Sequence, residues 1–254
     1  MGNIERVAVK VDVELAQALR FSVSGASPAV QNLTRFWKKL IADLKQGDQT
    51  PILAGDIRPV LVEGPVKIGS KEHTLNSPLV AVIEDITTSG DEVGLYRCAL
   101  VYQGGGRVIA GPGDIMAVSG DCEVMIEAWN MFTLQEKDLA PATFFQLSQE
   151  TVEAVKIYAA FQSQPGNKEY PPLMGIPEDC WKFPAMTSGD PRLQFRETEV
   201  EVGFVLGVRI FALLDEIEAR PVVRPSYLRV VSSQAWVPAL NSHPRPKLRL
   251  VVCH

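Results

Sequence analysis

Hydrophobic residues near the start of the chain follow two different periods. In residues 7–13 valine alternates with other residues, which is the two-residue period of a half-buried β-strand. From about residue 28 to 45, apolar residues recur every three or four positions, as they do along one face of an amphipathic helix. This stripe consists of Val30, Leu33, Phe36, Trp37, Leu40, Ile41 and Leu44. Ser27 is the candidate N-cap of the helix, and Pro28 suits its first position.

Short β-rich runs separated by turn residues occupy the middle of the chain, from residue 51 to 132. The predicted strands are residues 57–62, 79–86, 95–102, 107–110, 115–118 and 124–129. Because no helical period lies between these runs, we expect the strands to pair in an antiparallel manner. A sandwich, a barrel or a curled sheet would each satisfy this pattern.

Helical periods return in the C-terminal half. Ser148 is a candidate cap for a helix that continues to about residue 162. Thr198 and Glu201 fit a capping box at the start of a helix that continues to about residue 218. This second helix is apolar almost all round, so we expect it to be buried on most sides. A strand over residues 202–211 is the alternative interpretation of the same stretch.

Two glycines inside this last helix, Gly203 and Gly207, stand at GxxxG spacing. The apolar stretch is too short to cross a bilayer, so the spacing indicates that another element packs closely against the helix backbone. Residues 165–191, before the helix, are rich in proline and predict an irregular connection. Residues 227–231 and 247–253 are predicted strands.

Together these elements predict an α+β fold. It has an antiparallel β-rich middle lobe, an N-terminal amphipathic helix, and a C-terminal lobe of mixed helices and strands. We expect residues 1–254 to form a single compact unit. Its two lobes, residues 1–135 and 136–254, would meet near residues 132–140.

The composition is that of an ordinary globular protein. Of the 254 residues, 46% are hydrophobic and 22% are charged, which argues against intrinsic disorder. The longest strongly apolar stretch, residues 202–214, is shorter than the roughly 20 residues that a membrane span needs. The first residues show no secretory signal pattern. We therefore expect a cytoplasmic protein without a membrane span.

The residues that most often bind metals are few and scattered. The four cysteines are Cys98, Cys122, Cys180 and Cys253, and the three histidines are His73, His243 and His254. None of the cysteines forms a CxxC pair, and none of the histidines forms an HxH, HxxxH or HExxH pattern. We therefore expect neither a metal site nor a cofactor.

No catalytic motif emerges from the sequence. There is no Gly-x-Ser-x-Gly nucleophile elbow, and the glycines at 104–106 lack the Gly-Lys-Ser/Thr of a phosphate-binding loop. This favours a non-enzymatic protein with no catalytic residues. One alternative is an enzyme whose site is assembled from scattered residues, such as His73, Cys98, Asp114 and Asp121. Another is a module that binds a small ligand or a peptide through the same β-rich lobe.

Charge is divided unevenly along the chain. No acidic residue follows Glu218, whereas residues 1–218 carry 19 basic and 30 acidic side chains and the last 36 residues carry six basic ones. Such a segment can dock on the acidic body of its own or a neighbouring molecule. Because the segment also contains Tyr227 and Trp236, RNA is an alternative partner. The candidate interaction residues are Arg224, Arg229, Arg245, Lys247 and Arg249.

These observations favour one hypothesis about function. The chain would be a non-enzymatic structural protein that assembles with copies of itself, of the coat or matrix type. Its basic C-terminal segment would contact a neighbouring subunit or RNA phosphates. The expected partners are other copies of the chain, with RNA as the open alternative.

Overall fold

The computed structural model describes residues 16–17, 20–21, 28–62, 64–87, 93–103, 109–119, 122–162 and 169–219. The strand that the sequence predicts over residues 7–13 lies outside these ranges. So do the two predicted C-terminal strands and the five candidate interaction residues, Arg224, Arg229, Arg245, Lys247 and Arg249.

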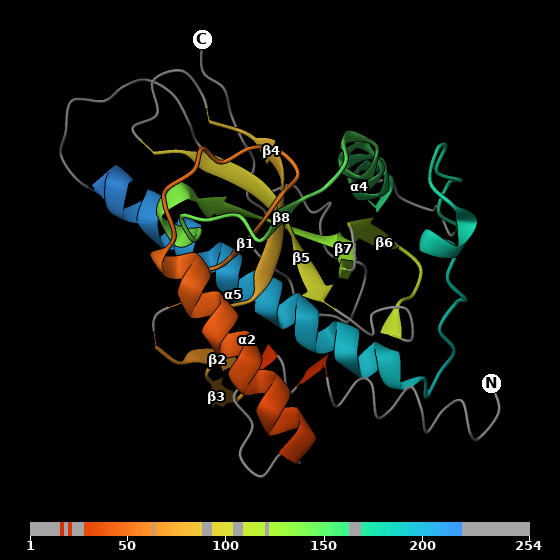
Figure 1. Ribbon diagram of the computed structural model, residues 1–254, viewed down its shortest axis with the longest axis horizontal. Helices are drawn as coiled ribbons and strands as arrows, with labels where there is room; N and C mark the ends of the chain where they lie inside the picture. Colours follow the sequence, from red (N-terminus) through yellow and green to blue (C-terminus); the bar gives the residue numbers. More distant parts are fainter. Residues whose placement is uncertain are drawn as a thin grey trace.

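An antiparallel sheet of six strands forms the centre of the molecule (Figure 1). Across the sheet the strands follow the order β6-β7-β5-β4-β1-β8. Their bounds are β1 (Asp56–Pro59), β4 (Leu79–Asp85), β5 (Leu95–Gln103), β6 (Asp114–Ser119), β7 (Cys122–Gln135) and β8 (Phe145–Gln146). A separate hairpin pairs β2 (Val66–Ile68) with β3 (Lys71–His73). The α+β class and the antiparallel pairing predicted from the sequence are confirmed.

Within the described ranges, three α-helices pack around this sheet. They are α2 (Pro28–Gln46), α4 (Gln149–Gln162) and α5 (Pro191–Ala219), and two short 3₁₀ helices, η1 (Glu136–Asp138) and η2 (Glu178–Cys180), lie between them in sequence. Helices α4 and α5 both contact β7, but they pack into different apolar clusters. In Figure 1, α5 is the long helix that crosses the view diagonally, and α4 lies at the upper right.

Side-chain alternation along the strands explains why both faces of the sheet are covered. In β4, Leu79, Ala81 and Ile83 pack into the cluster that contains α4, whereas Val80 and Val82 pack into the cluster that contains α5. Successive side chains of a strand point to opposite faces, so a strand that is apolar at every position must be buried on both sides. The sheet is therefore the middle layer between two helices.

One predicted strand is wrong in the part that the structure describes. Residues 109 and 110, the described part of the run predicted at 107–110, do not join the sheet, and Ile109 has a helical conformation. Side chains bind the backbone here in place of a neighbouring strand. Arg192 donates a hydrogen bond to the Ala110 carbonyl (2.8 Å), and the Gly111 N–H donates one to the carboxylate of Asp114 (2.7 Å).

The predicted start of the last helix is also wrong. Helix α5 begins at Pro191, seven residues before Thr198. Thr198 is therefore not a cap: its hydroxyl donates a hydrogen bond to the carbonyl of Gln194 in the preceding turn (3.1 Å). The cap is Asp190, whose carboxylate accepts a hydrogen bond from the backbone N–H of Arg192 (3.0 Å). An aspartate followed by proline at the first helical position is a stronger start signal than the capping box.

The close approach predicted from the GxxxG spacing is confirmed at Gly203. A methyl group on Gly203 would lie 2.5 Å from the side-chain oxygen of Asn130 on β7, whereas one on Gly207 would meet only Phe132, at the ordinary distance of 3.5 Å. Only a glycine at position 203 lets α5 approach the sheet this closely.

Gly203→Ala is therefore expected to destabilise the protein by about 1–3 kcal/mol, because the added methyl group displaces Asn130 or lifts the helix. Gly207→Ala is the matched control and should change the free energy of unfolding by less than about 1 kcal/mol. Urea denaturation of both variants measures the difference. Equal stabilities would contradict the proposed close contact.

A buried arginine, Arg58, joins β1 to two other segments of the chain, residues 50–51 and residues 140–141. Its guanidinium group donates to the carboxylate of Asp56 (2.8 Å) and to the carbonyl groups of Pro51 (2.7 Å) and Pro141 (2.7 Å). Further hydrogen bonds reach Thr50 and the Ala140 carbonyl. Because Arg58 is buried, its loss would leave Asp56 and several carbonyl groups without partners in a site that excludes water.

Arg58→Met is expected to lower the free energy of unfolding by about 3–5 kcal/mol, the usual cost of breaking one side of a buried ion pair. Arg97→Met is a suitable control, since Arg97 pairs with Glu84 at 3.2 Å but its side chain is 41% exposed. That change should cost less than about 1 kcal/mol. A similar loss in both variants, measured by denaturation with urea, would show that the Arg58 network adds no special stability.

Candidate functional site

Five polar residues lie together between α5 and the sheet, and we call them the α5 polar cluster. They are Arg20, Tyr102, Glu127, Asn130 and Glu199, and all five are buried. Arg20 pairs with Glu199 on α5 at 2.7 Å and donates a second hydrogen bond to the Tyr102 hydroxyl (3.1 Å). Asn130 on β7 donates both to Glu127 (3.0 Å) and to the Glu199 carbonyl oxygen (2.9 Å). The cluster therefore joins α5 to strands β5 and β7.

The two carboxyl groups of this cluster are not equivalent. Glu199 forms an ion pair with Arg20, whereas the carboxyl group of Glu127 accepts a hydrogen bond from the neutral side-chain amide of Asn130. Burial raises the pKa of Glu127 well above its ordinary value, and the nearby carboxylates of Glu199 and Asp114 raise it further. One oxygen of Glu127 and one of Glu199 have no hydrogen-bond partner. A protonated Glu127 removes the repulsion between two buried negative charges.

A second polar group lies beside this cluster, around Asp114 at the start of β6. Its carboxylate accepts hydrogen bonds from the Trp129 ring N–H (2.7 Å) and from Arg196 on α5 (2.7 Å). The guanidinium group of Arg196 also lies over the Trp129 ring, 4.6 Å from its centre. All the charges here are paired, so the group acts as a second attachment point for the N-terminal part of α5.

The three described residues of the suggested catalytic site lie in different surroundings. Asp114 belongs to the group just described, and Cys98 is fully buried in β5, where burial raises the pKa of its thiol. His73 lies in the separate β2-β3 hairpin and packs against Phe21, with ring centres 5.0 Å apart. Asp121 lies outside the described residues. A thiol with a raised pKa is a poor nucleophile.

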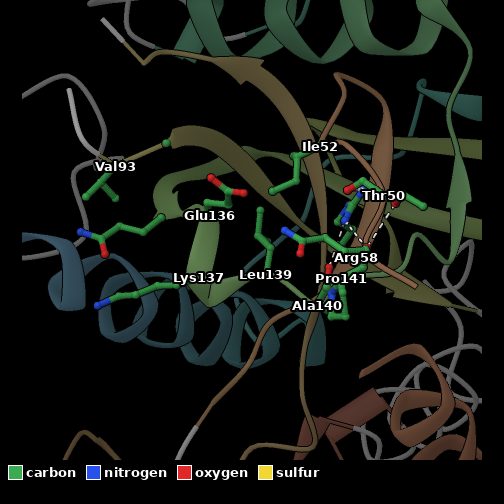
Figure 2. Close-up of a pocket in the computed structure, with 12 residues that line it drawn as sticks. Thr50, Ile52, Arg58, Val93, Glu136, Lys137, Leu139, Ala140 and Pro141 are labelled. Atoms are coloured by element: carbon green, nitrogen blue, oxygen red, sulfur yellow. Dashed lines mark hydrogen bonds between the residues drawn. The ribbon is translucent and has the colours of Figure 1, made fainter. Parts of the chain in front are cut away.

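A shallow pocket of about 510 Å³ lies near η1. Figure 2 shows Val93, Glu136 and Lys137 towards one end, and Arg58 with Thr50 and Pro141 towards the other. The donors of Arg58 are already bound to Asp56, Thr50 and backbone carbonyl groups, so they are not free to hold a ligand. Of the described lining residues, Lys137 is the remaining cationic group. The described candidates for catalysis, His73, Cys98 and Asp114, do not line this pocket.

Within the described ranges, no group of three or more His, Cys, Asp or Glu side chains is arranged to hold a metal ion. No helix in these ranges is both long enough and apolar enough to cross a membrane.

Two of the long helices leave large apolar side chains at the surface. Phe36 on α2 is 64% exposed and Phe204 on α5 is 54% exposed. Among the α2 side chains that the structure describes, Ile41 is buried and Trp37 packs on Phe144, whereas Phe36 is exposed. Exposed aromatic groups on regular helices can form an interaction surface when charged residues surround them.

Sequence reasoning missed the α5 polar cluster because its members are far apart along the chain. Arg20 and Glu199 are separated by 179 positions, so no local spacing reveals the pair. The only usable signal is Glu199, a charged residue in a stretch expected to be buried, where charged residues require partners.

Comparison with known proteins adds no relationship: no protein-family model matches the chain, and no curated protein or solved structure is significantly similar to it.

Because the pKa of Glu127 is raised, the free energy of unfolding should depend on pH. In the unfolded chain a glutamate ionises near pH 4.3. In the folded protein Glu127 keeps its proton to higher pH, so above about pH 4.3 the folded state holds a proton that the unfolded state has released. The free energy of unfolding contributed by this group therefore falls as the pH rises, until the pH passes the folded pKa.

Glu127→Gln removes the ionisable group and keeps a side chain of the same shape. The variant should gain stability relative to the wild type as the pH is raised from about 5 to 8, by at most about 1.4 kcal/mol per pH unit. Urea denaturation at several pH values measures the gain. Glu72→Gln, on the exposed face of β3, should follow the wild type at every pH. A constant difference between Glu127→Gln and the wild type would contradict the assignment.

Proposed function

We propose that the chain is a non-enzymatic structural protein that assembles with copies of itself, of the coat or matrix type. Residues 1–254 would act as one unit with the two lobes expected from the sequence. The observation that carries the proposal is the exposure of Phe36 and Phe204 on two long helices. Large aromatic side chains at the surface lose contact with water when a second copy covers them, which favours association.

The distribution of charged residues supports the same function. The described arginines Arg20, Arg58 and Arg192 are buried and neutralised within the fold, so they are not available to a substrate. The basic C-terminal segment is a candidate for contact between molecules. In this proposal Arg224, Arg229, Arg245, Lys247 and Arg249 bind the acidic surface of a neighbouring copy or the phosphates of RNA.

Light scattering after size-exclusion chromatography tests the proposal on the full chain. At micromolar concentration and low salt, we expect masses that are multiples of 27.9 kDa. These should fall towards the single-chain mass in about 1 M salt, where surface charges are screened within about 3 Å. Replacement of the five C-terminal basic residues by glutamine should weaken assembly at low salt. The ratio of absorbance at 260 and 280 nm would reveal bound nucleic acid.

Two outcomes would contradict the proposal. The first is a single-chain mass for the wild type at every salt concentration. The second is assembly that the glutamine variant leaves unchanged, which would remove the role of the basic segment. A triple variant at exposed lysines of the body, Lys67→Gln, Lys71→Gln and Lys182→Gln, controls for the loss of positive charge alone.

The pocket near η1 supports a second candidate function, a module that binds a small ligand in the β-rich part of the chain. Its volume of about 510 Å³ falls within the range of small-molecule sites. A thermal-shift screen with small carboxylic acids, which suit Lys137, tests this function. A rise in melting temperature that disappears in Lys137→Ala would favour it over assembly.

A further inference from the structure

The outer face of α5 carries an apolar stripe with an acidic edge. Leu193 and Phe204 are exposed on this face, and Val200 between them is partly exposed. Glu197 is exposed and Glu201 is partly exposed along one side of the stripe. The two carboxylates are four residues apart, which places them about 6 Å apart along the helix axis.

The outer face of α2 carries the complementary arrangement. Phe36 is exposed and Leu40 partly exposed, and they form the uncovered edge of the apolar stripe. Arg35 and Lys39, both exposed, lie beside them with the same four-residue spacing as the two glutamates of α5. Both faces therefore combine apolar residues with a pair of charges, and the two pairs are opposite in sign. On α2 the exposed Asp43 continues the row one turn beyond Lys39.

These four charged groups are not used inside the folded chain. In the part of the chain that the structure describes, no ion pair joins Arg35, Lys39, Glu197 or Glu201 to another residue. Helices α2 and α5 are also not among the pairs of elements that pack closely against each other. A contact between the two faces would therefore have to form between different molecules.

We propose that the outer face of α2 in one copy docks on the outer face of α5 in a second copy. This inference rests on the proposed function and names the interface through which assembly occurs. Phe36 and Leu40 would cover the stripe of Leu193, Val200 and Phe204. Arg35 and Lys39 would pair with Glu197 and Glu201, which gives the contact its specificity and its dependence on salt.

The handedness of the α-helix fixes the direction of this contact. Looking down the axis of α2 from its N-terminus and moving clockwise round the helix, the basic residues Arg35 and Lys39 come first and the apolar residues Phe36 and Leu40 follow. In the same view of α5, the apolar stripe comes first and the acidic pair follows. Two such faces match, charge to opposite charge and apolar to apolar, only when the helices run in nearly the same direction.

The contact joins two different faces, and each copy carries both of them. Every bound copy can therefore bind another, and the result is a ring or an extended assembly, unless two copies close on each other through both contacts. Helix α4 offers a weaker acidic face, because Glu153 already pairs with Lys156 at 2.9 Å. This helix supplies a control.

Charge reversal on each face separately tests the interface. One variant carries Arg35→Glu and Lys39→Glu, and the other carries Glu197→Lys and Glu201→Lys. Each variant alone places like charges across the contact, so the protein concentration at which half the chains are assembled should rise at least about tenfold. An equal mixture of the two variants restores opposite charges across the contact between unlike copies and should recover assembly. All measurements use the full chain at low salt.

The mixture distinguishes a direct contact between the two faces from misfolding and from a general effect of net charge. Neither of these would be reversed by mixing, and circular dichroism checks that each variant is folded. The control variant, Glu150→Lys with Glu153→Lys on α4, should assemble like the wild type.

Three results would each overturn a different part of the proposal. If the wild type assembles but the two variants also assemble normally, the interface is wrong while the proposed function stands. If the variants fail and their mixture also fails, the pairing of these faces is wrong. A wild type that never assembles overturns the proposed function itself.

Discussion

The buried ion pair between Arg20 and Glu199 fixes the rotation of α5 about its own axis. A charge that has been removed from water must find a partner of opposite sign, so Glu199 can point only towards the sheet. Asn130 and the missing side chain of Gly203 hold the same face of the helix close to β7. Because Glu199 points inward, residues 197, 201 and 204 point outward. The surface that α5 presents to other molecules is thus a consequence of what it buries.

This constraint has an energetic cost that the protein offsets locally. Two carboxyl groups, Glu127 and Glu199, share a buried space with a single arginine. Neutralising Glu127 with a proton is less costly than burying a second unpaired charge. The neighbouring group of Asp114, Trp129 and Arg196 adds a second attachment at the N-terminal part of the helix. On the β1 side of the sheet, Arg58 joins β1 to the segments at residues 50–51 and 140–141 in the same way.

The sequence was sufficient for features that depend on local spacing. The apolar runs of β4 and β5 and the Ser148 cap of α4 could be recognised because each signal lies within a few residues. The start of α5 was predicted too late, since the capping box at Thr198 concealed the Asp190 cap upstream. The β2-β3 hairpin was missed because strands of three residues are too short for a period to be seen. No reasoning from spacing could have paired Arg20 with Glu199, or could have shown that Phe36 and Phe204 are exposed.

Zero-length chemical cross-linking shows directly whether α2 of one copy contacts α5 of another. Carbodiimide joins a lysine amine to a carboxylate only where the two are in contact. Equal amounts of nitrogen-15-labelled and unlabelled protein would be assembled at low salt, cross-linked, digested and examined by mass spectrometry. We expect mixed-isotope links from Lys39 to Glu197 or Glu201 that disappear in high salt. If the protein assembles but no mixed-isotope link joins α2 to α5, the two helices do not form the contact between copies.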